Sequence, residues 1–361
     1  MSGGNTGDTV VNNGGAILLV ESELNLTNSI VTNNVTLATG GAITSVSSTL
    51  NLSNVEISKN SADSNASGLA LFLGSTSNID NSVISNNNGG GFGGGILVSG
   101  GSIVAINDTT ISGNTTRGNG GGIHNTEGTL TVSNSTISNN SAGLNGGGVA
   151  HSNGASASTT LTNTTISGNS ASSGGGIFST GSSIFIINNA TISENTSTTG
   201  GGIFLSSTNN DTTIDNSIIA GNTSSSLGNE IRAVSSSTTS NVMVTNSILG
   251  DNSQTPSEAF SVFSPDATSN FIATLSGNNP TGLRNIIAPL SDNGGDTLTH
   301  NLVNNSPAID AGDSINCPAT DQRGENRDDN CDIGAVEFDS NADITFFVVP
   351  LPNGNTVIFG L

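Results

Sequence analysis

Acidic side chains gather in three short stretches near the end of the chain: SDNGGD (residues 291–296), DAGD (310–313) and NRDDNCD (326–332). Carboxylate and amide oxygens are the hard ligands that calcium prefers. None of the stretches matches an EF-hand loop or the glycine-rich nonapeptide calcium repeat, so solvated acidic loops are the alternative interpretation. The candidate calcium ligands are Asp292, Asp296, Asp310, Asp313, Asp328, Asp329 and Asp332.

Basic side chains are scarce. Lys59 is the only lysine, and the formal net charge is -21. So few bases cannot neutralise a run of phosphates, which argues against nucleic acid and anionic membrane surfaces as partners. A polysaccharide lyase would need a base beside calcium-binding carboxylates, and a hydrolase would need a pair of acids. Neither set recurs in the sequence, so we expect a non-catalytic protein without catalytic residues or an organic cofactor.

The elements that position these residues are set by a repeated pattern, Asn-x-x-Ile-x-x-Asn. Its central apolar residues lie 26 to 30 residues apart, at Val31, Ile57, Ile84, Ile111, Ile137, Ile166, Ile192, Ile219 and Leu249. Three residues after each stands an asparagine: Asn34, Asn60, Asn87, Asn114, Asn140, Asn169, Asn195, Asn222 and Asn252. Three residues before each stands another asparagine, replaced once by Asp108. Such a period indicates a solenoid, a propeller or an array.

A second marker has the same period and appears as GGAI, GGIL, GGIH, GGVA and GGIF. Between the markers lie short alternating runs bounded by Asn, Ser or Gly, and no segment keeps a helical spacing. Three short strands per period leave no room for a four-stranded propeller blade. The sequence therefore predicts an all-β fold: a right-handed parallel β-helix of about nine to eleven coils with a C-terminal capping module.

The fixed letters of the repeat have structural roles in such a solenoid. Coils stack about 4.8 Å apart, so each fixed position forms a column along the axis. We expect the asparagines to take left-handed turn conformations and to bond the amides above and below them. Paired glycines allow close approach of coils, and Ile and Val fill a narrow interior.

Two further rows are candidates for function. His124 and His151 follow Gly-Gly-apolar markers in consecutive repeats, which could stack them as neighbours; His300 stands apart. A Thr-x-Ser row, at Thr110, Thr136, Thr165 and Thr191 with their serine partners, is expected to face outward. It could form a flat hydroxyl array of the ice-binding kind, but threonine on a solvated strand is the simpler interpretation.

The repeats and the end of the chain resemble known bacterial surface proteins. GGAI and the apolar-x-x-Asn element resemble the repeats of polymorphic outer-membrane proteins, and NSTISNNSAGLNGGG (residues 134–148) resembles proteins with a choice-of-anchor domain of the Q type. The segments 288–313, CPATDQRG and CDIGAVEF are similar to the C-terminal module of that family. The resemblance implies a secreted or surface-displayed, pectin-lyase-like β-helix; the Cys-rich N-terminal signature of relatives is absent.

The C-terminal region divides into distinct parts. The organisation expected is repeats over 1–255, an irregular final coil or linker over 256–282, an acidic module over 283–340 and an apolar tail over 341–361. Cys317 and Cys331 enclose a short polar loop in the module. A disulfide there would stabilise by about 3 kcal/mol and would indicate an oxidising compartment; two reduced thiols are the alternative. The tail holds PNGN between two apolar runs, which predicts a β-hairpin.

These features predict a structural or adhesin-like module of a secreted or cell-surface bacterial protein. The alternatives are a carbohydrate-binding or carbohydrate-cleaving solenoid and a filament subunit that uses its C-terminal strand. The expected partners are a glycan or a host surface, or a second copy bound through the tail. No stretch is apolar enough to span a membrane, and no export signal is recognisable at the start, so we expect that signal to lie outside this chain.

Overall fold

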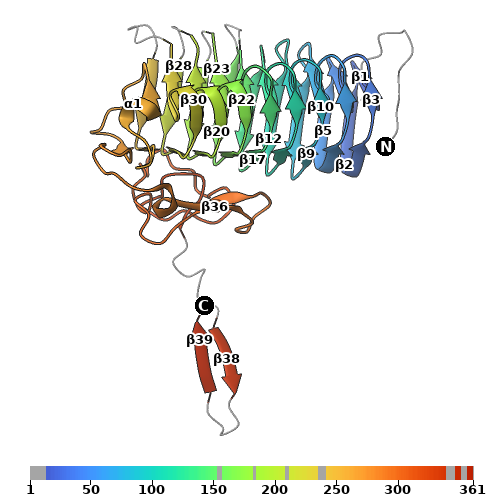
Figure 1. The fold of residues 1–361 in the computed structure, drawn as a ribbon. Coiled ribbons are helices and arrows are strands. Elements are labelled where there is room, and N and C mark those ends of the chain that lie inside the picture. Colours follow the sequence, from blue (N-terminus) through green and yellow to red (C-terminus); the bar gives the residue numbers. More distant parts are fainter. Residues whose placement is uncertain are drawn as a thin grey trace.

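The computed structural model describes residues 14–152, 157–181, 184–207, 211–234, 241–338, 346–350 and 356–360. Short parallel strands wind into a solenoid of about nine coils (Figure 1). Three sheets run along its axis, and nearly every pairing joins a strand to the equivalent strand one coil away. The all-β solenoid expected from the sequence is confirmed.

The first sheet has ten strands and is built from the Gly-Gly markers. In each of its central strands the first and third residues point into the solenoid and the middle residue points outward. Its strands are β1 (Ile17–Val20), β4 (Ile43–Val46), β7 (Leu69–Phe72), β11 (Ile96–Val98), β15 (Ile123–Asn125), β19 (Val149–His151), β23 (Ile177–Ser179), β27 (Ile203–Leu205), β31 (Ile231–Ala233) and β34 (Phe260–Ser261).

The second sheet has eight short strands that follow the ladder asparagines. They are β3 (Val35–Thr36), β6 (Ser61–Ala62), β10 (Asn88–Gly89), β14 (Thr115–Thr116), β18 (Ser141–Ala142), β22 (Ser170–Ser173), β26 (Thr196–Thr199) and β30 (Thr223–Leu227).

The third sheet has seventeen strands and bends within each coil into a first and a second limb. In the two N-terminal coils both limbs belong to one strand, β2 (Glu23–Thr32) and β5 (Thr49–Ser58). The first limb continues with β8 (Thr76–Asp80), β12 (Ile103–Asn107), β16 (Thr129–Ser133), β20 (Ser158–Thr162), β24 (Ile184–Asn188), β28 (Asp211–Asp215) and β32 (Asn241–Thr245). The second limb continues with β9 (Val83–Ser85), β13 (Thr110–Ser112), β17 (Thr136–Ser138), β21 (Thr165–Ser167), β25 (Thr191–Ser193), β29 (Ile218–Ala220), β33 (Ile248–Leu249) and β35 (Phe271–Ile272).

The two asparagines of the repeat have different roles. The one before the apolar residue makes the bend between the limbs: from Asn28 to Asn246 this position has a φ of 42° to 54°, the left-handed region that asparagine tolerates well. The one after the apolar residue is buried and forms a side-chain ladder. In that ladder Asn114 Nδ2 donates to Asn140 Oδ1 at 3.0 Å, and Asn140 Nδ2 donates to Asn169 Oδ1 at 3.0 Å.

Each ladder amide forms hydrogen bonds with backbone groups as well as with the neighbouring amide. The Oδ1 of Asn140 also accepts the backbone N–H of Asn114 at 2.9 Å, and its Nδ2 also donates to the carbonyl of Ile111. The ladder therefore satisfies buried backbone groups where the chain turns away from the sheet, which a buried turn otherwise leaves unpaired. Glycine is required beside it: a Cβ at Gly121 would lie 2.4 Å from the carbonyl oxygen of Gly147 in the next coil.

Beyond the last coils the chain leaves the solenoid and folds back along it. Residues 256–282 still contribute β34 and β35 to the solenoid. The short helix α1 (Pro256–Ala259) directly precedes β34. The C-terminal module, residues 283–338, contains the 3-10 turn η1 (Leu283–Asn285) and the antiparallel pair β36 (Ile287–Ser291) and β37 (Thr299–Leu302). It lies along the C-terminal half of the solenoid (Figure 1).

The apolar tail holds two strands, β38 (Phe346–Pro350) and β39 (Thr356–Gly360), which pair antiparallel as expected for a hairpin. The turn between them and the residues that join them to the module lie outside the described residues. Self-association through this tail stays a prediction.

Candidate functional site

The C-terminal module covers the outer face of the second limb. A second apolar core forms between them, in which Ile218 and Ile248 of the solenoid are packed with Ile287, Leu302 and Ile333 of the module. This overturns the expectation of a solvated Thr-x-Ser row. Thr136, Thr165 and Thr191 are at most 1% exposed, because the chain returns over them after the repeats end.

Gln322 of the TDQRG motif binds this row. Its Nε2 donates to Thr136 Oγ1 at 2.9 Å, and its Oε1 accepts the hydroxyl of Thr165 at 2.6 Å. The hydroxyl of Ser167 donates to Nε2 of His300 at 2.9 Å, since Nδ1 of that ring faces the carbonyl of Ala288. Thr, Ser and His here serve to dock the module.

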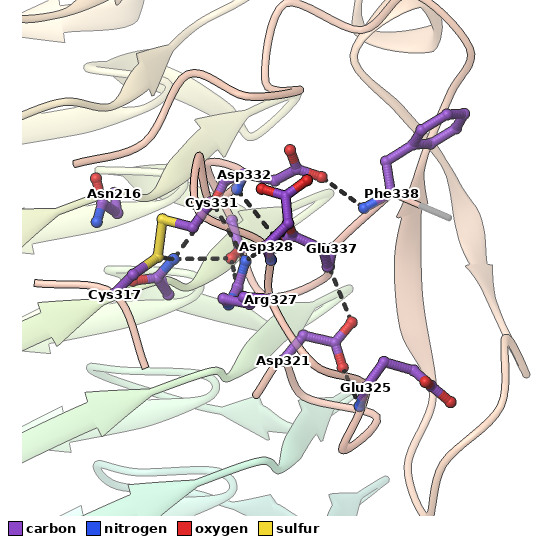
Figure 2. A network of polar contacts seen from close by, with 12 residues as sticks. Asn216, Cys317, Asp321, Glu325, Arg327, Asp328, Cys331, Asp332, Glu337 and Phe338 are labelled. Atoms are coloured by element: carbon purple, nitrogen blue, oxygen red, sulfur yellow. Dashed lines mark hydrogen bonds and ion pairs between the residues drawn. A yellow bond between two sulfur atoms is a disulfide. The ribbon is translucent and has the colours of Figure 1, made fainter. Parts of the chain in front are cut away.

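The module is held in shape by buried ion pairs and a disulfide (Figure 2). Arg327 Nη1 lies 2.9 Å from Glu337 Oε2, and Arg323 Nη2 lies 2.8 Å from Asp321 Oδ2. Cys317 and Cys331 are joined, with Cα atoms 6.5 Å apart. Asp321 of the TDQRG motif and Glu337 of the CDIGAVEF motif are therefore each neutralised by an arginine of the same module.

The structure does not bring the candidate calcium ligands together. Asp332 is buried and accepts the backbone N–H of Asp310 at 2.7 Å, and burial raises its pKa to about 7. In the loops, Asp292 and Asp328 each accept a backbone N–H two residues ahead. Within the described residues no three His, Cys, Asp or Glu side chains are grouped so that they could hold a metal ion. Of the remaining candidates, Asp313 is half-buried and Asp296, Asp310 and Asp329 are exposed.

One predicted member of the asparagine ladder lies outside it. Asn252 is exposed, and the ladder ends instead on Glu230, which is fully buried. Its carboxylate accepts Asn222 Nδ2 at 2.6 Å and the backbone N–H of Gly221 at 3.0 Å, and it also accepts Nε2 of Gln254. A carboxyl group, with two oxygens that accept, suits this end because the groups of Gly221 and Asn222 that face it are donors and no further asparagine follows in register.

A hollow of about 610 Å³ lies beside the end of the ladder, lined in part by Asp251, Glu258 and Arg284. Each charged group there is already engaged. Asp251 accepts the backbone N–H of Ser253, Glu258 accepts that of Thr255, and Arg284 pairs with Glu194. The described lining of this hollow therefore offers no unengaged acid and base that could act together on one substrate.

A groove of about 510 Å³ runs along the outer face of the ten-stranded sheet. Its floor is the column of middle residues in consecutive strands: Leu97, His124, Ala150 and Phe178, in register. Leu97 and Phe72 pack with two alanines in a small apolar cluster outside the main core. The floor is thus apolar and aromatic, and it faces outward.

Two columns of turn residues form the walls. On the side where the chain enters the sheet stand Asn65, Phe92, Asn119 and Asn145; on the side where it leaves stand Ser99, Thr126, Ser152 and Thr180. The amides are ordered, since Asn145 Nδ2 donates to Asn119 Oδ1 at 3.0 Å and Asn65 Oδ1 accepts the N–H of Phe92 at 3.0 Å. The Phe92 ring, 41% exposed, stands 5.1 Å from the ring of His124.

His124 is a buried, neutral member of the floor. Its Nε2 lies 2.7 Å from Ser152 Oγ, while its buried Nδ1 has no hydrogen-bond partner. Burial, with a smaller effect of His151, lowers its pKa to about 4, so the ring is neutral near pH 7.

The two histidines are not stacked as the sequence suggested. His151 is in register with Asn125, one position beyond the partner of His124. It points into the solenoid, where its Nδ1 lies 2.9 Å from Thr159 Oγ1 and its ring meets Phe185 edge-on. A shift of one residue along a strand places a side chain on the opposite face.

The floor was not identified as a site from the sequence, although its signal was present. The residue after the inward-pointing Ile or Val of the Gly-Gly marker supplies it: Leu in GGIL, His in GGIH, Ala in GGVA and Phe in GGIF. That letter varies while the rest of the marker is constant, as expected for a position that faces solvent or a ligand.

Comparison with known proteins agrees with the fold. Residues 5–158 match a model of right-handed β-helix regions. Among solved structures, the crystal structure of pectate lyase Pel9A is similar over 91% of this chain and 89% of that one, with 11% identity and a TM-score of 0.45. At this identity no residue role is carried over. No curated protein matches the chain.

Proposed function

We propose that this chain is a non-catalytic, glycan-binding module of a secreted or cell-surface protein, and that largely neutral sugars bind in the groove of the ten-stranded sheet. The observation that supports this most is an apolar and aromatic floor between two walls of amides and hydroxyls. Binding sites commonly combine an apolar surface with a few convergent polar groups.

The chemistry of the groove matches that of a sugar. A pyranose ring presents an apolar C–H face, which packs against the electron-rich face of an aromatic ring such as Phe92, and a rim of hydroxyls. An asparagine amide has both a donor and an acceptor for such hydroxyls. Asn119 and Asn145 place two such amides one coil apart. Among the described lining residues none carries a charge, which favours neutral sugars.

Binding without cleavage is supported by the same lining. General acid–base catalysis works best with groups whose pKa lies near the working pH, and the pKa of His124 is about 4. The described lining residues offer no carboxylate pair of the kind that glycoside hydrolysis uses. A rigid rod with a lateral groove suits an adhesin-like role.

Surface or extracellular placement is supported by the disulfide between Cys317 and Cys331, because such bonds persist in oxidising compartments. None of the helices in the described part of the chain has the length and apolar character to cross a membrane.

The test is a glycan array followed by calorimetric titration of the best neutral binder. Phe92→Ala should weaken binding at least tenfold, because it removes the most exposed ring over the groove. The matched control is Ile103→Ala, which removes a side chain 55% exposed on the outer face of the first limb, and it should bind like the unmodified protein.

Thermal unfolding of all three proteins checks that the fold is intact. No signal on the array above that of an unrelated protein would overturn the proposal, and so would equal affinities of Phe92→Ala and the unmodified protein. Release of reducing or unsaturated ends from a bound glycan would show that the module is an enzyme.

A further inference from the structure

The floor of the groove continues as a column beyond Phe178. Phe204 follows in register, with its ring centroid 5.6 Å from that of Phe178, and Arg232 follows Phe204 in the next coil. The guanidinium carbon of Arg232 lies 4.9 Å from the centre of the Phe204 ring. At about 4.8 Å per coil, Arg232 stands some four coils, or about 19 Å, from His124.

Arg232 lacks the carboxylate partner that the three arginines of the C-terminal module have. Arg284, Arg323 and Arg327 each form an ion pair. Across the described part of the chain no carboxylate pairs with Arg232: its Nη1 donates to Thr199 Oγ1, and its buried Nε has no hydrogen-bond partner.

An unpaired guanidinium is unexpected in a chain of net charge -21, where acids are plentiful. Stacking on Phe204 holds the planar group in place, and several of its N–H donors are left for another molecule. Arginine in this setting suits two-point recognition of a planar or tetrahedral anion.

We propose that Arg232 forms an anion subsite two coils beyond Phe178, where the groove ends, so that a glycan extending from the groove carries an acidic group on the residue that lies over Phe204. This rests on the proposed function above. A uronate carboxylate and a sugar sulfate share the required chemistry. A glycan with an acid on every residue is disfavoured, because the rest of the groove is uncharged and the whole chain repels polyanions.

The test compares the full chain with Arg232→Gln, Arg232→Lys and the control Lys59→Gln on one array. Lys59 is exposed on the turn after β5, so the control removes the same charge from outside the groove. The probes are neutral cello-oligosaccharides, the same oligosaccharides oxidised to glucuronate at one end, and the same oligosaccharides carrying a single 6-sulfate at one end.

We expect the unmodified chain and Lys59→Gln to prefer an acidic probe over its neutral counterpart by about tenfold. Arg232→Gln should lose that preference while it keeps its affinity for the neutral probe, and Arg232→Lys should keep part of the preference. The carboxylate and sulfate probes separate the two sources of the anion.

Binding of neutral probes without a preference for any acidic counterpart would overturn the anion subsite and leave the glycan-binding groove standing. An equal preference in Arg232→Gln and the unmodified chain would also overturn it. Absence of binding to every probe would overturn both proposals.

Discussion

At the scale of single residues, burial changes the protonation of a few side chains that the sequence presents as ordinary. Glu230 is surrounded by donors from Asn222 and Gln254, which favour its charged form, yet burial has the larger effect and raises its pKa to about 8. His124 and His151 are shifted the opposite way, to about 4. Both kinds of shift link stability to pH.

The sign for Glu230 follows from which state binds the proton. Between its usual value near 4.5 and about 8 the folded chain holds a proton that the unfolded chain has lost. Stability therefore falls as pH rises through this window. From pH 6.5 to 8 the loss expected from Glu230 alone is on the order of 2 kcal/mol.

Glu230→Gln should remove this loss, because the amide does not titrate. Chemical unfolding at pH 6.5, 7.5 and 8.5 measures the effect, with the exposed Glu127→Gln as the matched control. A decline with pH in Glu230→Gln as steep as in the unmodified chain would show that Glu230 is not its source.

At the scale of elements, the solenoid depends on two asparagine columns. One is needed for its backbone conformation and the other for its side-chain hydrogen bonds. The bend column requires a left-handed backbone and tolerates Asp108, because aspartate also adopts that conformation. The ladder column requires an amide that donates and accepts at once, and a carboxylate serves only at its end, at Glu230.

Asn140→Ala should destabilise the protein by more than about 1–3 kcal/mol, the usual penalty for one buried group left unsatisfied. The change strips partners from the side chains of Asn114 and Asn169 and from the backbone of Asn114 and Ile111. The measurement is the free energy of unfolding in denaturant.

The control for the ladder is Asn88→Ala, on the exposed face of β10, where the lost contact is a hydrogen bond from Thr115. A change of about 0.5 kcal/mol or less is expected there. Equal losses for Asn88→Ala and Asn140→Ala would contradict a special role of the ladder.

At the scale of the whole molecule, the C-terminal module and the repeats form one packed unit. The module contributes an apolar core of its own over the second limb and a polar clamp through Gln322. The module leaves the outer face of the ten-stranded sheet, on a different face of the coil, open for a partner.

Gln322→Ala should loosen this docking, because it removes hydrogen bonds to Thr136 and Thr165 and leaves the buried hydroxyl of Thr165 without its partner. Hydrogen exchange of β17, β21 and β37 should become faster, by about one order of magnitude for each 1.4 kcal/mol lost. The control, Asn330→Ala on an exposed loop, should leave exchange unchanged. Equal protection of β17 in Gln322→Ala and the unmodified chain would exclude the clamp.

The sequence by itself determined the coil, because a column arises wherever a residue recurs at the period of the solenoid. The strands, the bends at positions such as Asn134 and the buried Ile137 all follow from that local pattern. The residue that follows the inward-pointing Ile or Val of the Gly-Gly marker likewise faces outward by alternation alone.

Only the tertiary structure decided what covers each face. The Thr-x-Ser pattern around Thr136 and Thr165 is the same whether the strand is exposed or covered. These threonines are buried because a segment more than 150 residues later in the sequence packs over them. Two other contacts also depend on how coils stack: the ladder ends on Glu230, and Arg232 stacks on Phe204. No local sequence preference encodes such contacts between coils. The reason is physical: periodic contacts between neighbouring coils repeat a local spacing, whereas the docking of the module occurs once.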